Sequence, residues 1–163
     1  MKKINRTSKN SEYEAQTLLK EALEKSLITH NYVGVVQGKV EKEKDTITTW
    51  LSESTALKMH SSNVPNSGLK AITEYEVIKS NNKYSLVELK PKTRHKNQVR
   101  VHMHDIRHPV IGDEKYGATT KPISRLGLHA HFLEFKHPVT GKIVRFKSRT
   151  PQKFLDLFEA EEN

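Results

Sequence analysis

The sequence predicts an α+β fold in which helices flank a mixed, mostly antiparallel sheet. Segments with the composition and alternation of strands outnumber segments with helical spacing. The two kinds of segment do not alternate strictly along the chain, which argues against a parallel sheet built from repeated strand–helix units. With 163 residues, 34% of them hydrophobic, and no internal repeat or dividing linker, the chain is expected to form one domain with a compact core.

A helix is expected near the N-terminus. Residues 1–10 carry no apolar periodicity, and we expect them to form a flexible arm. Ser11 and Glu14 fit a capping box, and apolar residues recur behind it at helical spacing, which predicts a helix over Ser11–Leu27. The domain is therefore expected to cover residues 11–160, with 161–163 as a tail.

The rest of the chain reads mostly as strands. They are expected at Tyr32–Gln37, Thr46–Leu51, Ile72–Ile78, Tyr84–Leu89, Leu126–Phe135 and Lys142–Lys147. Asn81-Asn82 lies between the third and fourth of these segments and indicates a hairpin. Asn63–Gly68 has the composition of a loop. Two further helices are expected, at Asn97–Ile106 and Gln152–Ala160.

Positive charge is concentrated in one part of the sequence. The formal net charge is +9, and Leu89–Lys153 holds 15 Lys and Arg against 4 Asp and Glu. Between Glu88 and Asp105 stand five cations and no acid. Such a surface attracts a polyanion, because each neutralised phosphate releases counterions. The pattern favours nucleic-acid binding, although excess lysine can also serve only solubility.

Several other classes of protein receive no support. The sequence has no cysteine, so it has no disulfide, thiolate metal site or cysteine nucleophile. It has no apolar stretch of the length that crosses a membrane, and we expect a cytoplasmic protein. His104 and His108 would share a helical face near His102, but no Glu accompanies them as in the motif of zinc proteases. We therefore expect no metal.

A set of short motifs carries the most specific signal. Thr93–His102 reads Thr-Arg-His-Lys-Asn-Gln-Val-Arg-Val-His, and Arg107–Gly117 contains His-Pro-Val-Ile-Gly-Asp-Glu-Lys-Tyr-Gly. Leu-His-Ala and Phe-Lys-His-Pro follow, and Asn31–Gly38 precedes them as a strand with a tyrosine. In this order and spacing, the stretch from about residue 29 to 158 resembles the C-terminal part of the catalytic domain of RluA-type RNA pseudouridine synthases.

The resemblance implies a reaction and a set of site residues. The family isomerises uridine in structured RNA, ribosomal or transfer, to pseudouridine, without metal or cofactor. By resemblance, Tyr32 stacks against the uracil and Arg100 forms the ion pair that holds the catalytic aspartate. Without the resemblance, Tyr32 reads equally as a half-buried strand residue and Arg100 as a surface cation. RNA-binding residues are expected among the cations and the turn histidine: Lys90, Lys92, Arg94, His95, Lys96, Arg107, Lys115 and Arg125.

The catalytic His-Arg-Leu-Asp motif of the family is absent from the sequence. The four aspartates are Asp45, Asp105, Asp113 and Asp156, and none stands in that context. We therefore expect a partial catalytic domain that is inactive alone. The alternatives are an active enzyme with another acid, a degenerate RNA-binding protein, and a split enzyme whose missing half is another polypeptide. A carboxylate within hydrogen-bond reach of Arg100 would separate these readings.

Two further departures from the family pattern concern glycines. The Thr-Gly-Arg turn reads Thr93-Arg94-His95, and Arg107 replaces the glycine before His-Pro. There are two interpretations of these replacements. An arginine that must adopt a positive φ does so at an energetic cost, which could loosen the loop that positions Arg100; alternatively, the arginines add phosphate contacts. A partial domain should also leave a strand edge and an apolar face open. We therefore expect a homodimer, or pairing with the missing N-terminal half.

Overall fold

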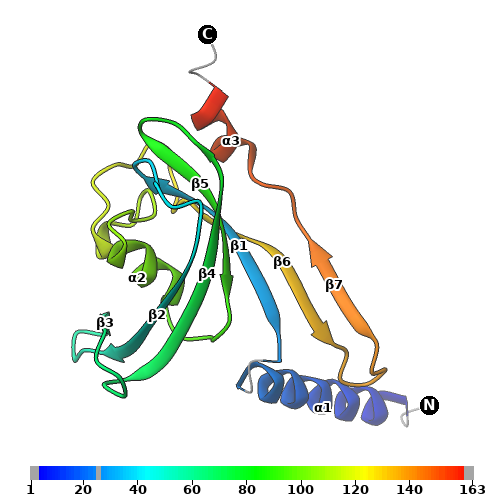
Figure 1. Cartoon of the computed structure of the whole chain (residues 1–163). Coiled ribbons are helices and arrows are strands. Elements are labelled where there is room, and N and C mark those ends of the chain that lie inside the picture. The colour runs from blue at the N-terminus through cyan, green and yellow to red at the C-terminus, as the bar shows by residue number, and fades with distance from the viewer. Residues whose placement is uncertain (1–3, 25–26, 160–163) are drawn as a thin grey trace.

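The computed structural model describes residues 4–24 and 27–159 and contains one seven-stranded sheet (Figure 1). Its strand order is β3-β2-β4-β5-β1-β6-β7, and every pair of neighbouring strands is antiparallel. The elements are α1 (Ile4–Glu24), β1 (Thr29–Gln37), β2 (Lys44–Glu53), β3 (Met59–Ser62), β4 (Leu69–Ser80), β5 (Tyr84–Pro91), α2 (Gln98–Asp105), the 3₁₀ turn η1 (Glu114–Tyr116), β6 (Leu128–Lys136), β7 (Ile143–Lys147) and α3 (Gln152–Glu159). The predicted α+β class with a mostly antiparallel sheet is confirmed.

The first helix begins earlier than the sequence predicts. Residues 4–10, expected as part of a flexible arm, belong to α1, so Ser11 lies within the helix and is not its cap. The physical reason is that a formed helix extends by one backbone hydrogen bond for each added residue, so it can continue beyond the segment that carries the apolar pattern. Three predicted segments lie outside the described residues. They are residues 1–3 of the arm, residues 25–26 near the predicted end of the first helix, and the tail 161–163.

The predicted strands are all present, and one short strand was missed. The hairpin between β4 and β5 turns at Asn81, whose side-chain oxygen accepts hydrogen bonds from the backbone N–H groups of Lys83 and Tyr84 at 2.9 and 2.8 Å. This arrangement is how asparagine stabilises a turn. The missed strand, β3, is four residues long and mostly polar, so it carries no strand pattern of its own. It forms by pairing with β2 at the edge of the sheet.

Both faces of the central strands are buried, each by a different helix. On one face, α2 contributes Val99 and Met103 to a core with residues of β1, β2, β4 and β5. On the other face, α3 contributes Phe154 and Phe158, which pack against residues of β1 and β5. Alternation along β1 sends Val33 and Val35 to the α3 face and Val36 to the α2 face. Tyr32 therefore lies on the α2 face, packed at the border of that core.

The end of α2 places an arginine where glycine is usual. Arg107 has φ 66°, and its N–H donates to the carbonyl of His104 at 2.9 Å. The N–H of His108 donates to the carbonyl of Met103, also at 2.9 Å. These two bonds form a Schellman motif, whose left-handed residue is most often glycine. The expected backbone cost is therefore present at Arg107, whereas Arg94 is not among the residues with positive φ.

Substituting Arg107→Gly should stabilise the protein. A side chain in the left-handed region costs roughly 1–2 kcal/mol, and glycine removes most of that cost while loosening the unfolded chain. We expect the free energy of unfolding to rise by about 1 kcal/mol. Urea denaturation followed by circular dichroism measures this change. Arg107→Ala is the control, because alanine keeps the Cβ atom; an equal gain from alanine would contradict the explanation.

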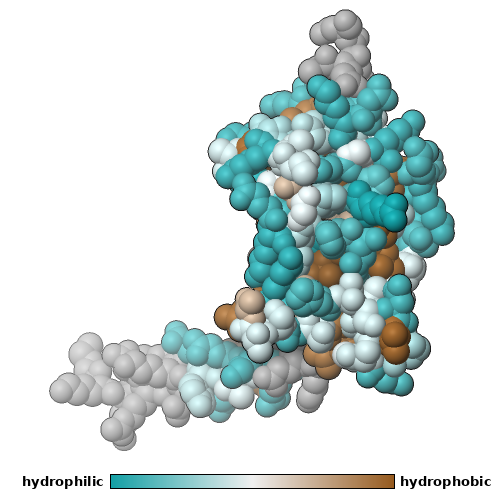
Figure 2. Space-filling model, turned by 90° about the vertical axis from the view of Figure 1, so that its left-hand side faces the viewer, coloured by the Kyte–Doolittle hydropathy of each residue, from teal (hydrophilic) through white to brown (hydrophobic). Residues whose placement is uncertain are grey.

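The sheet is open at β7, and α1 lies across the end of the sheet, beneath β1 and the turn between β6 and β7 (Figure 1). On β7, Ile143 and Phe146 are 56% and 58% exposed, and Phe146 stacks with Phe135 of β6 at 6.3 Å between ring centroids. Figure 2, which views the molecule from the side of α2 and β3, shows a mostly hydrophilic face with scattered apolar patches. Among the described helices, none is long and apolar enough to span a membrane.

Candidate functional site

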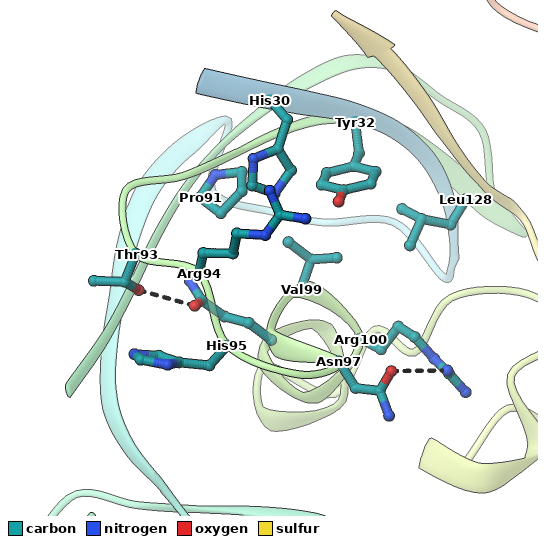
Figure 3. A pocket seen from close by; sticks show the side chains of 11 residues that line it. His30, Tyr32, Pro91, Thr93, Arg94, His95, Asn97, Val99, Arg100 and Leu128 are labelled. Carbon is teal, nitrogen blue, oxygen red and sulfur yellow. Dashed lines mark hydrogen bonds between the residues drawn. The ribbon is translucent and has the colours of Figure 1, made fainter. Parts of the chain in front are cut away.

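A pocket of about 160 Å³ opens on the α2 face of the sheet, between β1 and the loop that leads into α2 (Figure 3). Its described lining comes from β1, from the end of β5 and the following loop, from α2 and from β6. The residues are His30, Tyr32, Pro91, Thr93, Arg94, His95, Asn97, Gln98, Val99, Arg100 and Leu128. The fold thus brings four predicted site residues to one place: Tyr32, Arg94, His95 and Arg100. None of the described lining residues is an aspartate or a glutamate.

Two aromatic rings of β1 form one wall of the pocket. Residues 30 and 32 lie on the same side of the strand because side chains alternate. Their rings meet edge to face at 5.2 Å between centroids. Burial raises the pKa of the Tyr32 hydroxyl, which is therefore neutral at physiological pH, and the nearby charge of Arg94 opposes this rise. The wall thus offers an aromatic face that is partly shielded from water.

Arg100 is held by a buried carboxylate. Its Nε and Nη2 atoms donate to the two carboxylate oxygens of Asp113, each at 2.8 Å, and Nη1 donates to the side-chain oxygen of Asn97 at 3.2 Å. This bidentate bonding raises the pKa of the guanidinium. The side chain of Asp113 is fully buried, and Arg100 also lies 5.1 Å from the ring centroid of Tyr116. Arg100 is therefore a fixed part of the pocket wall.

A chain of buried hydrogen bonds fixes the loop before α2. Gln98 donates to the carbonyl of Ile72 and to the hydroxyl of Thr73, both at 2.9 Å, and it accepts a bond from Thr93 at 2.8 Å. Thr73 also contacts Nδ1 of His102 at 2.7 Å. The loop that carries Arg94 and His95 is thereby tied to the middle of the sheet through its two ends.

The second ring nitrogen of His102 completes this chain of bonds. Nε2 contacts the hydroxyl of Thr49 at 2.9 Å, and the imidazole is completely buried. Burial lowers the pKa of His102 to about 4, because a charged ring at this position would be out of contact with water and would have no acid partner. The ring is therefore neutral at physiological pH and joins two hydroxyl groups on neighbouring strands.

The run of cations before and within α2 is mostly paired with acids. Four of the five lie within 3.3 Å of a carboxylate oxygen. These pairs are Lys90–Glu88 (3.3 Å), Lys92–Glu74 (3.3 Å), Lys96–Glu53 (2.6 Å) and Arg100–Asp113 (2.8 Å). Within the described chain, the fifth cation, Arg94, has no acid partner. The exposed lysine pairs are weak and can exchange for phosphates.

The other residues expected to bind RNA are spread over the surface. His95 is bonded through Nε2 to the carbonyl of Lys70 at 3.0 Å. Lys115 donates to the carbonyl of Leu57 at 3.3 Å. Arg125 lies over the ring of Phe154, which belongs to the opposite face of the sheet. Lys92, Lys96, Arg107, Lys115 and Arg125 thus lie outside the described lining of the pocket, as does Lys90, which lines a separate hollow beside Glu74.

The histidines considered for a metal do not converge. His102 points into the core, His108 contacts the carbonyl of Gln37 through Nδ1 at 2.7 Å, and His104 is exposed beside Gly117. In the described part of the chain, no three His, Cys, Asp or Glu residues are grouped as a metal site would require.

His30 is the pocket residue that sequence reasoning missed. Burial lowers its pKa, the charge of Arg94 lowers it further, and the nearby backbone of Ile28 opposes both effects. Its Nδ1 atom is buried and has no hydrogen-bond partner. The signal that could have identified it is strand alternation, because residue 30 lies two positions before Tyr32 on the same strand.

Comparison with known proteins agrees with the motifs. The family model described as RNA pseudouridylate synthase matches residues 10–105. The chain is 31% identical over 147 residues to YjbO of Bacillus subtilis, an uncharacterized RNA pseudouridine synthase, covering 90% of this chain and 52% of YjbO. It is 30% identical to the ribosomal large subunit pseudouridine synthase D of Haemophilus ducreyi, covering 90% of this chain and 49% of that enzyme.

The fold is also shared with a solved structure. The structure of human RNA Pseudouridylate Synthase Domain Containing 1 superimposes with a TM-score of 0.68 at 24% identity, over 86% of this chain and 61% of that one. The chain spans about half the length of the bacterial relatives. The family model covers more than half of the chain, and the fold and the ordered motifs agree with it. This protein therefore belongs to the RluA-type RNA pseudouridine synthase family.

Proposed function

We propose that this chain binds structured ribosomal or transfer RNA and holds a flipped uridine against Tyr32, as the base-binding part of a pseudouridine synthase. One observation carries this proposal: the pocket combines an aromatic face with two guanidinium groups, and its described lining contains no carboxylate. An aromatic ring stacks on any base that has left its helix, and arginine side chains suit the phosphates beside it. No cofactor is needed, and we expect the protein in the cytoplasm.

The proposed uridine pocket needs a carboxylate from elsewhere for isomerisation. Asp113 faces Arg100, but both of its oxygens are engaged there and it is 1% exposed, so it does not reach a base in the pocket. Asp105 accepts a hydrogen bond from Ser61 at 2.7 Å and lies outside the described lining. We therefore expect this chain to isomerise uridine only when another polypeptide segment brings an acid to the pocket. That segment would correspond to the other half of the longer relatives.

A second candidate function is RNA binding without chemistry, and the buried position of Asp113 favours it. The two candidates separate in a pseudouridine assay on ribosomal and transfer RNA that lack the modification. The 163-residue chain should bind these RNAs with a salt-dependent affinity and form no pseudouridine. Adding the N-terminal half of YjbO, as a source of the missing acid, should restore product if the chain is the base-binding part of a synthase. Product from the chain alone would overturn the need for an outside carboxylate.

Removing the aromatic face of Tyr32 should weaken RNA binding. A base stacked on an aromatic side chain contributes roughly 1–3 kcal/mol, so Tyr32→Ala should weaken binding of a uridine-containing RNA by about 5- to 150-fold. Tyr32→Phe keeps the ring and should bind nearly as well as the wild type. Fluorescence anisotropy with a labelled RNA measures both variants. Equal losses in the two variants would mean that the hydroxyl, not the ring, makes the contact.

The open edge of the sheet favours a partner segment over a second copy of this chain. The strand β7 carries Lys147, and Lys142 precedes it, whereas Arg145 of the same strand is paired with Glu134 of β6. Antiparallel pairing of two β7 strands would bring these cations together, and like charges opposite one another destabilise a sheet. We therefore expect the isolated chain to sediment as a monomer and to pair at this edge with a different segment. A stable dimer in sedimentation equilibrium would contradict this expectation.

A further inference from the structure

We propose that Arg94, beside His30, forms a phosphate-binding subsite at the pocket, which takes a phosphate that flanks the uridine. This inference rests on the proposed function, because the same pocket holds the base. It adds a residue for which the family motif gives no role, since Arg94 stands where the family has a glycine.

The first observation is that Arg94 is uncommitted. The other four cations of its run each contact a carboxylate, whereas the described residues offer none to Arg94. Arg94 is exposed to solvent, and Figure 3 shows its side chain reaching toward His30 and Tyr32. A guanidinium that lines a pocket without an acid is available to an anionic ligand.

The second observation is that Arg94 acts on both aromatic residues of the wall. Figure 3 shows its guanidinium beside the ring of His30 and on the side of Tyr32, and all three side chains line the pocket. In agreement, its charge lowers the pKa of His30 and counters the rise in the pKa of Tyr32. His30 adds an imidazole that lines the pocket and meets the ring of Tyr32 edge to face. A phosphate at this point would meet the N–H donors of the Arg94 guanidinium, with the imidazole of His30 beside it. The ring of Tyr32, on which the base would stack, lies 5.2 Å from that imidazole between ring centroids.

Two kinds of anion fit a free guanidinium, a phosphate and a protein carboxylate. The solvent exposure of Arg94 favours the phosphate, because a nucleic-acid backbone runs over a surface and needs no burial of its charge. The adjacent lysine pairs also lie on the surface, where they can exchange glutamate for further phosphates. A carboxylate from another protein segment is the alternative that the experiment must separate.

The experiment compares four ligands on the ¹⁵N-labelled 163-residue protein: uridine, uridine 5′-monophosphate, inorganic phosphate and acetate. Resonances of the Arg94 and His30 side chains report occupancy. Uridine monophosphate should bind about tenfold more tightly than uridine, as expected for a charge-assisted hydrogen bond. Arg94→Gln should remove this difference and leave uridine binding unchanged. The matched control is Lys44→Gln, which removes a cation of β2 that pairs with Glu76 and lies outside the described lining of the pocket, and it should keep the difference.

Each outcome bears on the subsite or on the base pocket separately. Equal affinities for uridine and its monophosphate in the wild type would overturn the phosphate subsite and leave the uridine pocket standing. A response to phosphate that depends on Arg94, without any response to uridine, would support the subsite and count against the proposed function. Acetate binding as strongly as phosphate would mean that Arg94 accepts a protein carboxylate, and would also overturn the phosphate assignment.

Discussion

Asp113→Asn is expected to lower the free energy of unfolding by about 3 kcal/mol, because breaking a buried ion pair leaves its partner charge uncompensated. The substitution removes the charge that holds Arg100 through two hydrogen bonds and turns one hydrogen-bond acceptor into a donor facing the guanidinium. The side chain of Arg100 is only 23% exposed, so water replaces the lost partner incompletely. Urea denaturation at neutral pH measures the change.

Two further variants test whether the buried pair is the cause. Asp45→Asn breaks the exposed pair with Lys42 and should leave the free energy of unfolding nearly unchanged. The double variant Arg100→Met with Asp113→Asn removes both charges, and it should lose less than the sum of the two single losses. Strict additivity would show that the Arg100–Asp113 contact does not couple the two residues.

The extent to which the fold was predictable follows from how local each signal is. The signals for the hairpin at Asn81 and for the apolar face of α2 each lie within a few consecutive residues, and both features were predicted. The strand β3 was missed because its four residues form a strand only beside β2, which supplies the hydrogen bonds. Residues 4–10 were assigned to an arm because their sequence carries no apolar period, so the continuation of α1 into them leaves no signal to detect.

The candidate site was predictable only in part, for the same reason. The ordered motifs named Tyr32 and Arg100, and the fold places both at one pocket. Their predicted roles remain proposals. The charge count suggested a continuous basic surface, but four of the five cations from Lys90 to Arg100 meet acids, and two of these acids, Glu53 and Glu74, come from other strands. Such pairs depend on strand register, which the sequence reveals only after the sheet is known. Among the five cations of the run, Arg94 could therefore be identified as the one without an acid partner only from the structure of the described residues.

Acidification is expected to destabilise the protein through His102, by about 3 kcal/mol in total, from the difference between its folded and unfolded pKa. The pKa of the buried ring is about 4, below the ordinary histidine pKa of 6.5. Between these values the unfolded chain binds a proton that the folded protein does not, so stability falls as the pH falls. The loss begins near pH 6.5 and is complete near pH 4. Between pH 7.5 and 5.0 it should amount to roughly 2 kcal/mol.

The variant His102→Gln separates this effect from all other titrations. It should be less stable than the wild type at pH 7.5, because it cannot keep both hydroxyl contacts, to Thr49 and to Thr73. Its stability should nevertheless fall by about 2 kcal/mol less between pH 7.5 and 5.0, since it has no imidazole to protonate on unfolding. His60→Gln, at an exposed position in β3, should keep the pH dependence of the wild type. If His102→Gln and the wild type lose the same stability between pH 7.5 and 5.0, the core tolerates a charged His102. The prediction that a neutral His102 ring joins the hydroxyls of Thr49 and Thr73 would then be wrong.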